Sequence, residues 1–267
     1  MLRGASAEAL AELGQQASRA RTLEEGATLG TQLFGVASVV RRDVALRRAL
    51  TDSSVEGESR SGLAHAVFGK ALDEPALSLV ADAASRRWIS SNDLPEALER
   101  VAVAATVRSA GANGKQVGDE LFAVRQMIEG SPSLRGALAD NSRTAEDRSG
   151  LLLRLLDGKT LPATGVLVGQ AVTRGRGTVE GALQDYVDLA ADALEEVVAT
   201  VHTAKELSAD EQKRLAVSLG KQYGKDVQLH VVVDPSLIGG LRVEIGDDVI
   251  DGSVLSRLDE ARRRLAG

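Results

Sequence analysis

Apolar residues recur at helical spacing through about the first 195 residues of the chain. In one stretch Leu33, Val36, Val39 and Val40 share a face, and spacing of three to four residues is typical of an amphipathic helix with one buried side. The same pattern predicts further helices at 57–69, 74–88, 93–110 and 178–195. The segments LTDSS (50–54) and LADNS (138–142) interrupt the pattern, and we interpret them as loops that carry candidate N-cap residues.

The helical part contains an internal repeat. Residues 30–63 align without a gap on residues 118–151, and fifteen of these 34 positions are identical. The match resumes between VADAASR (80–86) and VGQAVTR (168–174) at the same offset of 88 residues. Unrelated helices rich in alanine and leucine rarely keep one offset over such a length, so we infer a duplicated helical module. Paired positions are expected to be structurally equivalent, as in Leu33/Leu121, Phe34/Phe122, Leu50/Leu138 and Arg60/Arg148.

The pattern changes after residue 195, where β-branched residues become frequent. Four segments are typical of strands, namely VVATVHTA (197–204), DVQLHVVVD (226–234), LRVEIG (241–246) and VID (249–251). Between the first two, Ser208 is the predicted N-cap of a helix. A last amphipathic helix is predicted from Ser253, with Leu255, Leu258 and Leu265 on its apolar face. The expected C-terminal unit is therefore a small α/β domain of βαββα type.

These patterns predict a mainly α protein with three domains. An extra helical module is expected at 1–105, a second helical bundle at 106–195 and the α/β domain at 196–267. Composition agrees with this fold class, because aromatic residues make up only 2% of the chain and prolines number five. Alanine and leucine must fill most of the core, and both are good helix formers.

Charge and composition exclude several classes of function. The net charge is −6, acidic and basic residues are mixed, and neither a basic face nor aromatic platforms appear, so we expect no nucleic acid partner. The chain has no cysteine and no apolar run long enough to span a bilayer. We therefore expect contact with a membrane only through partner proteins.

Apparent cofactor motifs are incomplete. LLDGKT (155–160) imitates the end of a phosphate-binding loop, but leucine occupies position 153 where that motif needs glycine. RGRGTVEG (174–181) imitates a dinucleotide loop, but glutamate replaces its third glycine and no strand precedes it. His65, His202 and His230 are scattered, without metal-ligand spacing. We therefore expect no cofactor, no metal and no catalytic residues.

The conspicuous residues near the C-terminus have local structural explanations. Gly239 and Gly240 permit a positive φ or a close backbone approach before a strand. Asp247 and Asp248 are expected in a hairpin turn, where short acidic side chains bond the local backbone. Asp251, together with Ser253, is placed to cap the last helix.

The segment VQLHVVVDPSLIGGLRVEIGDDVIDGSVLSRLDEARRRL (227–265) also resembles the C-terminal signature of the delta subunit of F-type ATP synthase, called the oligomycin-sensitivity-conferring protein in mitochondria. The resemblance rests on a hydrophobic strand, Asp234, Gly239 and Gly240, alternating apolar residues and GDDVIDGS with its Asp251 and Gly252. Residues from about 106 to the end fit an ordinary subunit. The additional copy ahead of them is similar to the longer delta subunits of some high-GC bacteria.

The resemblance implies a non-catalytic stator subunit at the cytoplasmic face of the bacterial plasma membrane. Family members join the catalytic head, through the N-terminal helices of the alpha subunits, to a b-type peripheral stalk. The helix with Leu255, Leu258 and Leu265 is the candidate stalk contact. The repeat alone also fits a helical adaptor of another assembly, and this alternative stays open at this stage.

Overall fold

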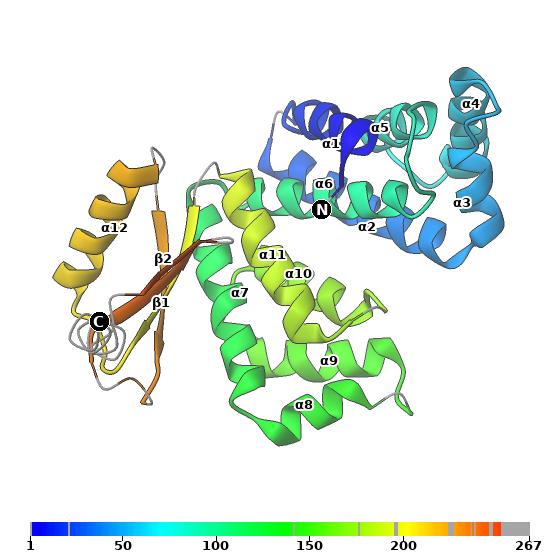
Figure 1. Cartoon of the computed structure of the whole chain (residues 1–267). Helices are drawn as coiled ribbons and strands as arrows, with labels where there is room; N and C mark the ends of the chain where they lie inside the picture. The colour runs from blue at the N-terminus through cyan, green and yellow to red at the C-terminus, as the bar shows by residue number, and fades with distance from the viewer. Residues whose placement is uncertain are drawn as a thin grey trace, which may run out of the picture. The chain divides into compact units, whose positions relative to one another are not determined.

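The chain divides into two compact units, residues 1–190 and 191–267. The structure is a computed structural model that describes residues 2–20, 22–140, 142–175, 177–194, 197–223, 227–235, 237, 239–245 and 248–251. The first unit is helical and the second holds a small sheet (Figure 1). The predicted fold class is therefore confirmed, whereas the further division at residue 105 stays a prediction. In the described ranges, no helix is long and apolar enough to cross a membrane.

The helical unit follows the predicted pattern closely. Its elements are α1 (Gly4–Ala17), α2 (Leu23–Arg42), α3 (Val44–Thr51), α4 (Gly57–Phe68), α5 (Glu74–Ser85), α6 (Asp93–Arg108), the 3-10 turn η1 (Gly111–Asn113), α7 (Gly114–Glu129), α8 (Pro132–Ala139), α9 (Ala145–Leu156), α10 (Pro162–Thr173) and α11 (Val179–Ala193). Small and aliphatic side chains fill the core, which suits a chain with so few aromatic residues.

The repeat seen in the sequence is also a structural repeat. At the offset of 88 residues, α3, α4 and α5 coincide in both bounds with α8, α9 and α10. Leu33 and Leu121 are both fully buried, and Leu50 and Leu138 are 1% and 3% exposed. The predicted equivalence of these leucines is confirmed, because matched positions serve the same core in each copy.

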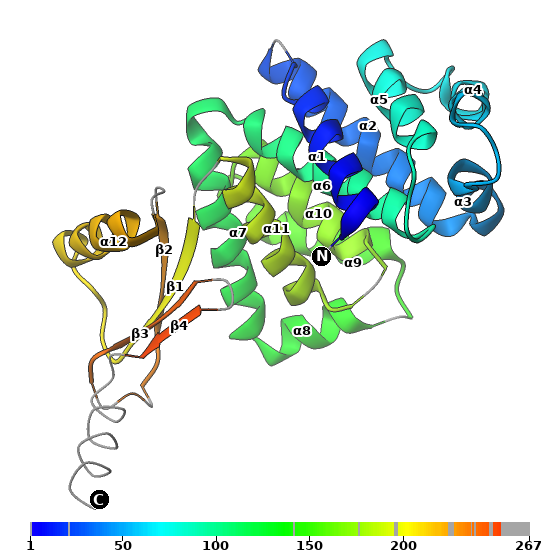
Figure 2. The ribbon, with the colours of Figure 1, turned by 45° about the horizontal axis from the view of Figure 1, so that its top comes forward.

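One helix belongs to both copies. The offset that places α3 on α8 also places α1 on α6, and the two helices share the tripeptide Glu-Ala-Leu at 8–10 and 96–98. In the first repeat α6 is the last helix and packs along α2 and α1. In the second repeat it is the first helix and contacts α10 and α7 (Figures 1 and 2). The copies are thus not strung end to end, and α6 crosses the predicted boundary at residue 105.

Two details of the helical prediction were wrong. Val39 was placed on the buried stripe of α2 but is 46% exposed, because Leu33, Val36 and Val40 already occupy the inward face. The loop LTDSS does not supply the N-cap of α4, which is Glu56. Its Asp52 instead accepts hydrogen bonds from the backbone N and Oγ of Ser54, both within 2.9 Å.

The second repeat has the same loop geometry. Asp140 accepts from the backbone N and Oγ of Ser142 at 2.9 and 2.6 Å. The N-cap of α9 is Thr144, which lies outside LADNS. In both copies the aspartate therefore closes a local turn after one helix rather than starting the next.

The C-terminal unit is a four-stranded mixed sheet with one described helix. Its elements are β1 (Val197–Thr203), α12 (Ala209–Tyr223), β2 (Val227–Val233), β3 (Leu241–Ile245) and β4 (Asp248–Asp251). The strand order is β2-β1-β3-β4, with β1 parallel to β2 and antiparallel to β3. The parallel pair is joined through α12, as a parallel connection requires.

The helix α12 begins as predicted and covers one face of this sheet. Ser208 Oγ accepts from the backbone N of Glu211 at 3.4 Å, and Glu211 Oε2 accepts from the backbone N of Ser208 at 2.9 Å. This reciprocal pair is a capping box. Leu219 of α12 packs with Val201 and Val243 in the core of the unit.

Candidate functional site

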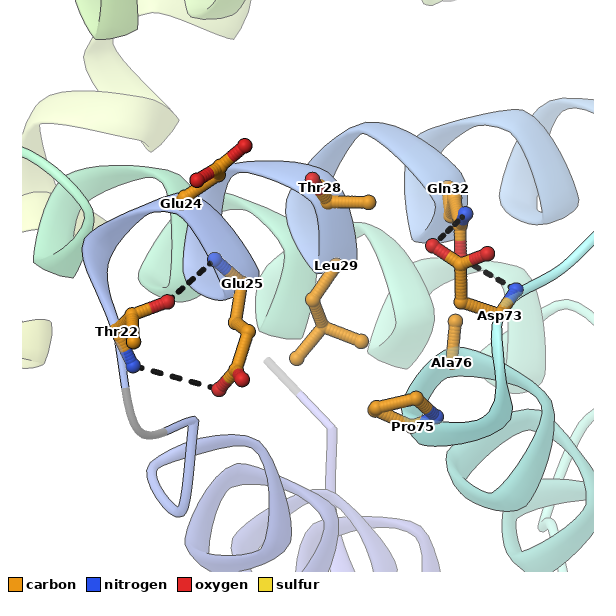
Figure 3. Close-up of a pocket in the computed structure, with 9 residues that line it drawn as sticks. All are labelled: Thr22, Glu24, Glu25, Thr28, Leu29, Gln32, Asp73, Pro75 and Ala76. Carbon is orange, nitrogen blue, oxygen red and sulfur yellow. Dashed lines mark hydrogen bonds between the residues drawn. The ribbon is translucent and has the colours of Figure 1, made fainter.

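A groove lies between α2 and α5 in the first repeat (Figure 3). It has a volume of about 510 Å³. A second hollow of about 430 Å³ adjoins it, shares Glu25, Leu29 and Pro75, and extends the groove to Gln16 and Ala17 of α1. We call the two together the α1/α2/α5 groove. Concave surfaces with an apolar floor are typical of binding sites.

Hydrogen bonds fix both walls of this groove. At the start of α2, Thr22 Oγ1 accepts from the backbone N of Glu25 at 3.1 Å, and Glu25 Oε2 accepts from the backbone N of Thr22 at 3.3 Å. At the start of α5, Gln32 Nε2 donates to Asp73 Oδ2 at 2.9 Å. The backbone N of Asp73 donates back to Gln32 Oε1 at 3.1 Å. The capping box of α2 and the pair of hydrogen bonds between Gln32 and Asp73 therefore hold the two walls in place.

The second repeat holds the start of its fifth helix in the same way but with a different side chain. Glu120 occupies the position of Gln32, and its Oε2 accepts from the backbone N of Leu161 at 2.9 Å and from Thr164 Oγ1 at 2.5 Å. Like Gln32, it holds the start of the fifth helix of its own copy. The two copies thus share the architecture of this wall but differ in its charge.

A buried carboxylate links the two repeats at the shared helix. Glu99 of α6 has a side chain only 4% exposed. Its Oε2 forms an ion pair with Arg41 of α2, and its Oε1 lies 2.8 Å from Arg174 Nε after α10. Tyr186 of α11 donates its hydroxyl to the same Oε1 at 2.8 Å. Three elements from both copies therefore converge on one side chain.

The surroundings of Glu99 keep the cluster neutral overall and tightly packed. Arg174 also pairs with Asp185 at 2.6 Å, and its guanidinium lies 5.8 Å from the centre of the Tyr186 ring. Phe34 of α2 packs against the same ring at a centroid distance of 6.4 Å. Burial, and then the charge of Glu99, raises the pKa of Tyr186 well above its ordinary value. The phenol therefore remains a hydrogen-bond donor through the neutral range.

Two of the predicted turn residues in the C-terminal unit lie where β2 ends and β3 begins. The backbone N of Asp234 donates to Thr203 O at 2.8 Å, and its carbonyl accepts from the backbone N of Leu237 at 3.2 Å. Gly240, directly before β3, has a φ of 80°. Gly240 thus has the positive φ that a glycine permits.

The remaining residues of this predicted site are only partly described. The prediction that Asp248 lies in a turn was wrong, because it is the first residue of β4 and pairs with Ile245 of β3. Since only two residues separate these strands in the sequence, Asp248 already belongs to the paired part of the hairpin. Asp251 pairs with Arg242 as the last residue of β4. Gly252, Leu255, Leu258 and Leu265 lie outside the described residues, so the predicted cap and the candidate stalk-contact helix stay predictions.

The two apparent cofactor motifs lie in connections between helices. Gly158 has a φ of 68° just after α9, and Lys159 Nζ donates to Leu155 O at 2.9 Å. This geometry is a helix C-terminus followed by a lysine, as predicted. Gly175 and Gly177, with φ of 73° and 69°, connect α10 to α11. Neither segment follows a strand, which both nucleotide motifs require.

Sequence reasoning missed the Glu99 cluster and the groove. Glu99 stands among the buried positions Leu98, Val101 and Ala102 of α6, and a carboxylate at such a position signals a buried partner. Arg174 was visible in the repeat as the counterpart of Arg86. No local pattern marks the groove, because it forms between helices that are distant in sequence.

Known proteins resemble this chain along its whole length. The family described as ATP synthase delta (OSCP) subunit matches residues 96–265. Proteins named ATP synthase subunit delta match from Nocardioides sp. (48% identity, 100% of this chain and 98% of the relative), Kineococcus radiotolerans (42%, 98% and 97%) and Streptomyces coelicolor (38%, 99% and 98%). The family match begins inside α6, whereas the bacterial relatives also cover the helices before it.

Proposed function

Because this chain belongs to the family of ATP synthase delta (OSCP) subunits, we propose that its helical unit holds the catalytic head and its C-terminal unit holds the stalk. The chain is a non-catalytic component of the peripheral stalk of ATP synthase. The observation that carries this assignment is the full-length identity with bacterial delta subunits. It leaves no support for a helical adaptor of another assembly.

The proposed partners are the N-terminal helices of the alpha subunits and a b-type stalk subunit. Helical bundles suit the first partner, because grooves between helices receive the apolar face of an amphipathic helix. The C-terminal unit, with its own core around Val201 and Val243, suits the second. The proposed location is the cytoplasmic face of the bacterial plasma membrane, where the chain is held by these partners.

The mechanical role follows from the rotary reaction of the complex. A rotor that turns inside the catalytic head exerts torque on it, so the head must be tied to fixed parts of the assembly. A tie needs extended contact and internal rigidity rather than a nucleophile or a metal. The Glu99 cluster supports this role, because it joins both helical repeats through one buried carboxylate.

A pull-down with separate partners tests the proposal. The full chain and a variant that lacks residues 253–267, and with them Leu255, Leu258 and Leu265, are each mixed with purified alpha and b fragments. We expect the deletion to lose b and keep alpha. Undiminished b binding by the deletion would place the stalk contact elsewhere in the chain.

A further inference from the structure

We propose that a hollow at the end of α10, in the second repeat, is the binding site for a tryptophan side chain that a partner protein presents on an acidic segment. The first repeat uses its own Trp88 at the matching helix end. The inference goes beyond the proposed function, because it does not depend on which subunit of the complex supplies the tryptophan.

In the first repeat, side chains of the same repeat cover the end of α5. The indole Nε1 of Trp88 donates to Ala83 O at 2.9 Å, and the side chain is buried. Arg60 of α4 is also buried and donates to Ser85 O at 2.9 Å and to Arg86 O at 2.7 Å. Carbonyl groups at a helix end have no donor within the helix. Trp88 and Arg60 therefore satisfy and shield this end of α5.

The residues that permit this arrangement differ in the second repeat. A Cβ at Gly57, the first residue of α4, would lie 2.7 Å from Ser85 O, so a side chain there would push α4 away from the end of α5. The matching residue in the second repeat is Ala145, the first residue of α9. Trp88 is matched by Arg176, which lies outside the described residues. The second repeat therefore has neither the glycine nor the tryptophan of the first.

A hollow of about 430 Å³ lies at the corresponding helix end of the second repeat. Its apolar lining includes Ala171 and Val172 of α10 and Leu138 of α8. Ala171 matches Ala83, whose carbonyl accepts from the indole in the first repeat. The volume lies within the range of roughly 300–1,000 Å³ that is typical of binding pockets. Volume, apolar lining and the matched backbone position together suit an indole ring.

Two arginines set the charge that this hollow prefers. Arg148 is half-buried and is the counterpart of Arg60, but it donates to Leu138 O at 2.8 Å. Arg135 is exposed and pairs with Glu180 at 3.7 Å. Among the described lining residues, these two arginines thus stand against one glutamate. Because guanidinium groups bind carboxylates and pack on indole faces, we expect aspartate or glutamate beside the inserted tryptophan.

The binding of a short peptide to the full chain, followed by NMR, tests the proposal. The probe is a synthetic peptide in which two acidic residues flank a tryptophan on each side, and the controls replace its tryptophan by alanine or its acidic residues by lysine. We expect the probe to shift the amide signals of Ala171 and Val172, less strongly at high salt. The signals of the matched Ala83 and Ala84 should stay in place. Equal binding of either control, or shifts at the first repeat instead, would overturn the proposal.

Two exposed residues of α8 supply matched variants for the same measurement. Ala139 lines the hollow, whereas Ser133 is not among the described residues that line it. Ala139→Phe should fill the hollow and raise the Kd of the probe at least about tenfold, while Ser133→Phe should bind it like the unsubstituted chain. Since both positions are exposed, circular dichroism should report the same fold for each variant. Unchanged affinity in Ala139→Phe would place the tryptophan elsewhere and overturn the proposal.

Discussion

The hydroxyl of Tyr186 donates to Glu99 Oε1 at 2.8 Å, and this hydrogen bond ties the last helix of the second repeat to the helix that both repeats share. Arg41 approaches the same carboxylate from the first repeat. The duplication therefore produced two copies that are joined through one buried side chain. Such a contact suits a stator subunit, because it transmits torque on one repeat directly to the other.

Glu99→Gln should destabilise the helical unit by about 3 kcal/mol, because it leaves buried arginine charge without its partner. Glu96→Gln on the same helix is the matched control. Its carboxylate forms a half-buried pair with Arg100 one turn along the helix, and pairs at this spacing contribute about 0.5 kcal/mol. Urea unfolding followed by circular dichroism measures both. Equal stability of the two variants would contradict a structural role for the cluster.

The raised pKa of Tyr186 predicts how stability depends on alkaline pH. Burial keeps the phenol protonated in the folded chain, whereas in the unfolded chain it ionises near pH 10. Its contribution to stability is therefore complete below about pH 10 and is lost as pH rises toward the raised pKa. In Tyr186→Phe, the free energy of unfolding should therefore decrease less steeply above about pH 10.

Absorbance can follow this ionisation directly. The chain has two tyrosines, so Tyr223→Phe leaves Tyr186 as the single titrating phenol. Its ionisation should occur well above the ordinary range and coincide with loss of helix signal. A reversible titration near pH 10 in the folded protein would contradict the buried hydrogen bond.

The two loop aspartates should titrate alike. Hydrogen bonds from the side chain and backbone of Ser54 lower the pKa of Asp52, and those from Ser142 lower the pKa of Asp140. The stabilisation from each is present above the unfolded pKa and is lost as pH falls through the lowered value. Ser54→Ala and Ser142→Ala should each raise the pKa of the neighbouring aspartate, as measured by NMR titration. A response in only one copy would argue against equivalent loops.

Gly240→Val should destabilise the C-terminal unit by about 1–3 kcal/mol, because a β-branched residue is strained at a φ of 80°. Gly240→Asn is the control, since asparagine tolerates a positive φ far better than a β-branched residue does. Hydrogen exchange should rise in β1 and β3 and remain unchanged in the helical unit. Equal exchange in the two variants would show that backbone strain at Gly240 does not govern the stability of this turn.

The sequence revealed the repeat but not how its copies are joined. Identities at one offset predicted buried pairs such as Leu50 and Leu138, because core positions are fixed by helical periodicity. The sharing of α6 was missed, since the prediction assigned that helix to the first copy and the resemblance between α1 and α6 is short. The partners of Glu99 come from residues up to 87 positions away, and such contacts leave no local pattern. The predicted N-cap was confirmed at Ser208 but was wrong for the loop LTDSS. Serine and aspartate bond the local backbone in turns as readily as at helix starts, so the residue type alone does not decide between the two.

The assembly of a ternary complex tests directly whether this chain links the catalytic head to the stalk. The purified catalytic head, the full chain and a soluble b fragment are mixed and analysed by native mass spectrometry. We expect a complex that contains all three, with one copy of this chain, because separate units hold the two partners. Mutually exclusive binding of the head and of b would contradict the claim that the chain links them.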